Sequence, residues 1–275
     1  MANKTEASEL IDYGVDTKNR RIYFGMVSID PESTGSDFAW QSVEIAIRAL
    51  HKLSETSKKP IELHMNSPGG SSIDMMRLYD EIQSCPCKII FIGGGQVSSS
   101  ATWIMAGCDE RLLHRHTELI FHDGSDEIAD RHTDLQIYAK ATEDHMQDLY
   151  KIYADNSRMP LTFWQDVCQR DLRLSADETV SFGLADKVIE YKKRGNLRRS
   201  RIAIMNQEVD AGEMKALVKS VYKRIRRHKN LNKIEISVKK EEFDKSVIVD
   251  LSDVQTDLPL PSDPKVIVQD VSKLP

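Results

Sequence analysis

The chain has 275 residues, a formal net charge of −5 and an apolar fraction of 40%. These values predict a soluble protein with one main domain, or one domain with an appendage. We see neither a secretion signal nor an apolar run long enough to span a bilayer, so we expect no membrane contact. The four cysteines match no zinc pattern, which predicts free thiols, no metal site and a cytoplasmic location; they are Cys85, Cys87, Cys108 and Cys168.

The first third of the chain alternates between strand and helix patterns. Short apolar or alternating runs predict strands, and apolar residues at helical spacing predict helices. Breaker-rich segments between them predict turns and loops. The expected elements are a strand at 21–27, a turn at 31–37, a helix at 38–54, a strand at 60–65, a loop at 66–70, a helix at 72–83 with Ile73, Met76, Tyr79 and Ile82 on one face, and a strand at 87–92.

The same alternation continues to about residue 190. Ser175 and Glu178 form a capping-box pattern that opens a helix, and Gly183 ends it. Strands that alternate with helices favour an α/β fold with a mainly parallel sheet. The expected elements are strands at 111–114 and 118–121, a long amphipathic helix at 133–155, a helix at 161–168 and a strand at 185–189.

The composition changes after residue 190. Residues 192–229 are strongly basic, whereas the chain from residue 241 is acidic and gains prolines. A helix is expected near 213–227, and the apolar runs 247–249 and 266–268 suit either paired strands or docking segments. We predict a flexible segment at 1–20, a main domain at 21–190 and a charged, partly ordered extension at 191–275. The basic stretch has few interleaved aromatic residues, so we do not expect it to bind nucleic acid.

A glycine-rich stretch at 93–101 carries three serines between an apolar strand and an apolar helix. A serine there lies at a helix N-terminus, where unpaired amides and the helix dipole favour negative charge. This arrangement suits a nucleophile beside an oxyanion site, and it equally suits a plain capping serine. Nucleotide binding is disfavoured, because no lysine follows at the phosphate-loop spacing.

A serine nucleophile needs a base and an acid that orients the base. His122 follows an apolar strand directly, where a loop would expose it. Asp171 follows Arg170 between a helix and a turn. Taken singly, such a histidine is more often structural and such an aspartate more often part of a surface ion pair.

Taken together, these motifs form an ordered string that resembles the ClpP family, the proteolytic subunit of Clp proteases. The resemblance covers residues 21–190 and implies stacked ββα units of the ClpP/crotonase type. It implies a serine endopeptidase with Ser99 as nucleophile, His122 as base and Asp171 as acid, and with the Gly70 and Ser100 amides as oxyanion hole. The matching segments are Asn-Ser-Pro-Gly-Gly at 66–70, Gly-Gln-Val-Ser-Ser at 95–99, Ile-Phe-His at 120–122, Arg-Asp at 170–171, Ser-Ala at 175–176 and Gly-Leu-Ala-Asp at 183–186.

The choice among the three adjacent serines depends on where the count starts. Counting forward from Gly95 and Gln96 gives Ser99, and we prefer this count because the turn sets the geometry. Counting back from Ala106 and Gly107 favours Ser98 instead.

The resemblance also implies an assembly. In the family, the long helix that 133–155 matches forms a handle, which interdigitates two stacked seven-membered rings into a tetradecameric barrel. No cofactor is implied, and ATP enters only through an unfoldase ring of the AAA+ class. The substrates are polypeptides.

Three departures bear on the function. Glu62 and His64 replace the aromatic residues that line the unfoldase docking cleft, which argues against docking. The segment 123–130 is acidic instead of glycine-rich, and the extension from Lys192 is unlike the housekeeping enzyme. These features resemble phage or prophage members, so a head maturation protease that works without an unfoldase is one alternative. An inactive ring subunit is a second, and a crotonase-type acyl-CoA enzyme is a third.

Overall fold

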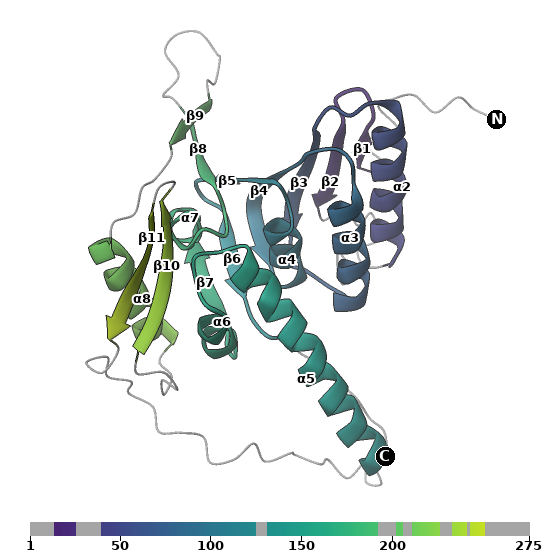
Figure 1. The fold of residues 1–275 in the computed structure, drawn as a ribbon. Coiled ribbons are helices and arrows are strands. Elements are labelled where there is room, and N and C mark those ends of the chain that lie inside the picture. Colours follow the sequence, from purple (N-terminus) through teal and green to yellow (C-terminus); the bar gives the residue numbers. More distant parts are fainter. Residues whose placement is uncertain are drawn as a thin grey trace, which may run out of the picture.

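The computed structural model describes residues 14–25, 40–124, 131–191, 202–205, 211–225, 233–240 and 243–250. Within them, nine strands form one sheet with the order β1-β2-β3-β4-β5-β8-β9, while β6 branches from β4 and pairs with β7 (Figure 1). The strands are β1 Val15–Asp16, β2 Arg21–Gly25, β3 Ile61–Ser67, β4 Ile89–Ser98, β5 Glu110–His114, β6 Glu118–Phe121, β7 Leu172–Ser175, β8 Lys187–Tyr191 and β9 Ile202–Met205.

The sheet is mainly parallel, as the alternation of strands and helices predicted. The run β2-β3-β4-β5-β8 pairs in parallel throughout, whereas the outer strands β1 and β9 are antiparallel to β2 and β8. Strand β4 forks: its first half pairs with β5, and its second half pairs in parallel with β6. Strand β7 then runs antiparallel to β6.

Helices α2 and α3 lie side by side on one face of the sheet, with α4 beside α3 (Figure 1). Helix α5 extends away from the sheet (Figure 1). Helices α6, α7 and α8 lie on the opposite side of α5 from α2 and α3 (Figure 1). The helices are α2 Trp40–Thr56, α3 Ser72–Ser84, α4 Ser100–Ala106, α5 His132–Asp155, α6 Leu161–Val167, α7 Ala176–Phe182 and α8 Ala211–Ile225.

Only the C-terminal part of α5 is packed into the subunit. Leu149 and Tyr153 are fully buried, whereas Ile137 and Tyr138 are 65% and 42% exposed. The buried end joins an aromatic cluster, in which Tyr153 stacks on Trp103 at 5.7 Å between ring centroids and meets Phe121 at 5.5 Å. The long helix is therefore anchored at one end and protrudes at the other.

Some local predictions were wrong. The turn expected after Asp171 is strand β7. The glycine-rich stretch does not form a turn, because β4 continues through it to Ser98. The register between β3 and β4 shifts there, and the Asn66 side chain accepts a hydrogen bond from the Gln96 amide at 3.0 Å. Asn66 and Ser67 consequently belong to β3 and not to the following loop.

Another error concerns the face of α3. Its buried residues are Met75, Leu78 and Ile82, whereas Ile73 is 78% exposed. Both this stripe and the predicted one have helical spacing, because Met75 and Met76 are adjacent and both apolar. The spacing alone could not decide which stripe faces the sheet.

The extension contributes to the core of the main domain, which was not predicted. The inward residues of α8 are buried in the same hydrophobic cluster as the sheet and the other helices. Strands β10 Lys233–Lys240 and β11 Phe243–Asp250 form a separate antiparallel hairpin. The run 247–249 thus pairs with β10, and its other suggested partner, 266–268, lies outside the described residues, as does the predicted turn at 31–37. In the described part of the chain no helix is long and apolar enough to cross a bilayer.

Candidate active site

Ser99 lies between the end of β4 and the start of α4, in an unusual backbone conformation. Its φ is +53°, a value that non-glycine residues rarely adopt, and such strain is concentrated at functional sites. Its amide donates to the Ile120 carbonyl at 2.8 Å, which ties the turn to β6. Its side chain makes no capping hydrogen bond to α4.

The two neighbouring serines are engaged elsewhere. Ser98 is 4% exposed, and its hydroxyl accepts a hydrogen bond from the Gln96 side chain at 3.1 Å. Ser100 is fully buried, and its hydroxyl donates to the Gly70 carbonyl at 3.2 Å. Of the three hydroxyls, the half-buried Ser99 is thus the most accessible to a reagent.

The loop after β3 lies directly against the Ser99 turn. A Cβ on Gly69 would be 2.6 Å from the Ser99 Cβ and 2.7 Å from the Ser98 carbonyl oxygen, and the φ of Gly69 is +100°. The Gly69 amide donates to the Ser67 hydroxyl at 3.1 Å, which fixes the turn. The loop thereby brings Gly70 next to Ser100, as a two-amide oxyanion site requires.

The predicted site residues stand next to the ends of strands that pair in sequence. Ser98 pairs with Ile120 across β4 and β6, and Phe121 pairs with Leu172 across β6 and β7. His122 directly follows β6, and Asp171 directly precedes β7. Strand β6 thus lies between β4 and β7 (Figure 1).

Within the described residues, no hydrogen bond joins the side chains of Ser99, His122 and Asp171. Catalytic hydrogen bonds commonly tighten only when substrate binds, so this geometry is compatible with a triad. The backbone beside them is fixed, because the Asp123 amide donates to the Cys168 carbonyl at 2.8 Å. That bond ties the residue after His122 to the segment that leads to Asp171.

Two residues that the sequence did not single out support the serine turn. The Thr102 hydroxyl lies 2.6 Å from the Ser99 carbonyl and 2.5 Å from the Tyr153 hydroxyl. Because Thr102 has one proton and donates it to the carbonyl, Tyr153 must be the donor to Thr102. The only hint in the sequence was a threonine three residues after Ser99.

The buried cysteines are poor alternatives as nucleophiles. Burial raises the pKa of the Cys108 and Cys168 thiols, which keeps both uncharged near neutral pH. Across the described residues, no group of three or more His, Cys, Asp or Glu side chains could hold a metal ion.

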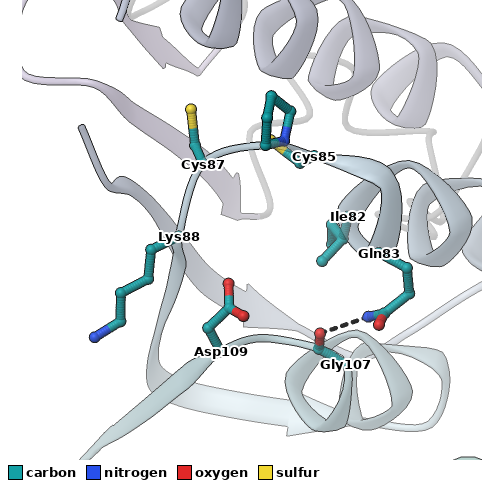
Figure 2. A pocket seen from close by; sticks show the side chains of 8 residues that line it. Ile82, Gln83, Cys85, Cys87, Lys88, Gly107 and Asp109 are labelled. Carbon is teal, nitrogen blue, oxygen red and sulfur yellow. Dashed lines mark hydrogen bonds between the residues drawn. The ribbon is translucent and has the colours of Figure 1, made fainter. Parts of the chain in front are cut away.

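A cavity of about 360 Å³ lies elsewhere, at the turn between α3 and β4 (Figure 2). Cys85, Cys87, Lys88 and Asp109 are among the residues that line it, and the Gln83 side chain donates to the Gly107 carbonyl at 2.7 Å across its edge (Figure 2). Gly107 ends α4, whereas Ser99 precedes it, so this cavity is separate from the serine turn. Burial raises the pKa of Cys85, which leaves that thiol unreactive.

The exposed face of β2 and β3 is polar, as Glu62 and His64 suggested. Glu62 accepts hydrogen bonds from Arg21 at 2.7 Å and from His64 at 2.9 Å. Burial opposes ionisation of Glu62, but these bonds outweigh it and hold the pKa of Glu62 below its ordinary value. The His64 ring also stacks on Tyr23 at 4.6 Å.

The comparisons with known proteins agree with the fold. The family model described as Clp protease matches residues 33–192. The ATP-dependent Clp protease proteolytic subunit 2 of Pseudomonas aeruginosa is 31% identical over 146 residues, which cover 52% of this chain and 72% of that protein. The chain therefore belongs to the Clp protease family, whose members are serine peptidases.

Proposed function

We propose that this chain is a Clp-type serine endopeptidase subunit in which Ser99, His122 and Asp171 act as the catalytic triad. The observation that supports the proposal is the pairing of β4 with β6 and of β6 with β7, because each of the three residues directly follows or precedes one of these strands. The positive φ of Ser99 and the closeness of Gly69 support it further.

The reaction follows from these positions. His122 takes the proton of the Ser99 hydroxyl, whose oxygen attacks the carbonyl carbon of a peptide bond, and Asp171 stabilises the imidazolium that forms. The Gly70 and Ser100 amides donate to the oxyanion of the tetrahedral intermediate. His122 then protonates the departing amine, and water hydrolyses the Ser99 ester by the same steps in reverse.

The test is covalent labelling by a fluorophosphonate probe. The full chain should be labelled, Ser99→Ala should not, and Ser98→Ala should be labelled like the wild type. The matched pair differs by one position in the same turn, and circular dichroism would show that both variants are folded. Labelling that survives Ser99→Ala and disappears in Ser98→Ala would move the nucleophile to Ser98.

We further propose that the subunit assembles into rings through α5 and works in the cytoplasm on polypeptides. Ile137 and Tyr138 expose apolar surface on the protruding part of this helix, where a second subunit could cover it. Sedimentation of the wild type should show a large oligomer. Ile137→Asp should shift the distribution to smaller species, whereas Lys140→Ala on the same helix should not.

The cluster of Arg21, Glu62 and His64 favours a subunit that works without an unfoldase. Ion-paired side chains would have to be desolvated under an apolar docking loop, which is costly. We therefore expect cleavage of an unfolded protein such as casein without ATP. Degradation of a folded, tagged protein only with an AAA+ unfoldase and ATP would contradict this.

A further inference from the structure

We propose that α8, which lies beyond the residues matched by the family model, is a positioning element for the catalytic centre. Through Tyr222 and Arg224 it fixes α6 and β7, the two elements between which Asp171 lies. This inference rests on the proposed function, because it concerns the same His122 and Asp171.

The first observation is how completely α8 is packed. Met214, Val218, Val221 and Tyr222 are at most 1% exposed and belong to the core of the main domain. The Tyr222 ring meets the Phe163 ring of α6 edge to face, with centroids 6.2 Å apart. Contacts of this kind make α8 part of the peptidase domain and not a loose appendage.

The second observation concerns the buried groups where α8 faces α6. The Tyr222 hydroxyl is buried and has no hydrogen-bond partner within the described residues, and Asp166 of α6 is only 4% exposed. Burial and then the charge of Asp166 raise the pKa of Tyr222, so its hydroxyl stays neutral. The contact of Tyr222 with α6 is therefore made by its ring against the Phe163 ring.

The third observation ties α8 to β7 and α7. Arg224 forms an ion pair with Glu178 at 2.8 Å and donates to the Arg173 carbonyl at 3.4 Å. Glu178 also closes the capping box with Ser175 at the start of α7. Arg224 therefore holds the strand that begins directly after Asp171.

These contacts converge on a short segment. Residues 168–171 run from the end of α6, which Tyr222 holds, to the start of β7, which Arg224 holds. Within this segment the Cys168 carbonyl accepts the hydrogen bond from the Asp123 amide, next to His122. Both partners of the proposed His–Asp pair are thus tied to a segment that α8 anchors at each end.

The chemical consequence concerns the base. An aspartate held against an imidazole stabilises the imidazolium, which raises the pKa of the histidine and orients it toward the serine. If the segment loosens, the productive orientation of His122 should become rarer. The predicted signature is a lower kcat with little change in KM.

The test uses the full chain with Tyr222→Ala and Arg224→Ala, and with Lys223→Ala as the control. Lys223 is an exposed cation one residue from Arg224, so its loss changes the charge equally. We expect each test variant to lower kcat on a fluorogenic peptide ~10-fold with little change in KM. Hydrogen exchange at the Asp123 amide should also accelerate, while the control matches the wild type.

Two results would overturn the inference. One is wild-type kcat in both test variants, even if exchange at Asp123 accelerates. The other is a loss of activity that follows the fraction of Ser99 still labelled by fluorophosphonate, because that is what simple instability gives. If the wild type itself is not labelled at Ser99, the proposed function fails first and the catalytic part of this inference fails with it.

Discussion

Gly69 and Ser99 follow the ends of different strands and lie 30 positions apart in the sequence. No room is left between them for a side chain on Gly69. A Cβ added to Gly69 would lie 2.6 Å from that of Ser99, closer than such atoms approach in proteins. The Ser-Pro-Gly-Gly loop therefore packs directly against the Ser99 turn. Only glycine combines this contact with a φ of +100°.

Gly69→Ala should consequently impair the site more than the fold. We expect kcat/KM to fall at least ~10-fold, because the turn must shift away from its oxyanion amides, with a loss of about 1–3 kcal/mol in the free energy of unfolding. Peptide hydrolysis and denaturant unfolding measure the two effects. Gly25→Ala is the matched control, since nothing lies within 4 Å of a Cβ there. Equal activity of both variants would show that the contact is irrelevant.

Tyr153→Phe removes the hydroxyl that donates to Thr102 in the core. The Thr102 hydroxyl would keep its bond to the Ser99 carbonyl but lose its own donor, so we expect a loss of about 1–2 kcal/mol in the free energy of unfolding. Burial raises the pKa of Tyr153 well above its ordinary value, so this hydroxyl cannot serve as a base near neutral pH. Activity per folded subunit should therefore change by no more than about threefold, and a far larger drop would contradict the structural role.

Arg111 and Asp186 join β5 to the start of β8. The Arg111 side chain is 14% exposed, contacts both Asp186 carboxylate oxygens at 2.8 and 3.1 Å, and donates to the Asn156 carbonyl at 2.9 Å. Asp186→Asn leaves a largely buried guanidinium without its counter-charge, so we expect a loss of about 3 kcal/mol in unfolding experiments at fixed protein concentration. Glu143→Gln, at an exposed pair on α5, should cost at most about 0.5 kcal/mol.

Glu62 makes the stability of the β2–β3 face depend on pH. Its pKa lies below the ordinary 4.5, because the hydrogen bonds from His64 and Arg21 outweigh burial. Its contribution is therefore complete above pH 4.5 and is lost as the pH falls through the lowered value. Compared with the wild type, Glu62→Gln should be less stable by at most about 1 kcal/mol at pH 7, and this difference should shrink as the pH falls below 4.5. A difference that stays constant as the pH falls would argue against the ion pairs as its source. Glu55→Gln is the exposed control.

The sequence predicted most elements of the main domain, because buried strands and amphipathic helices alternate clearly and the capping box of Ser175 is local. It was wrong where two local patterns compete, as on α3, and where a glycine-rich stretch continues a strand. The proposed triad of Ser99, His122 and Asp171 was predicted from the order of the motifs and stays a prediction. The contacts of Gly69, Thr102 and Tyr153 were not predicted, since they join distant segments. The docking of α8 depends on the same kind of contact, and helical spacing predicted its apolar face but not what that face would cover.

The fork in β4 has a consequence for the life of the chain before assembly. The end of β4 that precedes Ser99 is held by β6, and β6 is held in turn by β7. Because Asp171 follows α5 in the sequence, a nascent chain that has emerged only as far as α5 lacks this residue. The proposed triad can therefore be complete only in a chain that extends to β7.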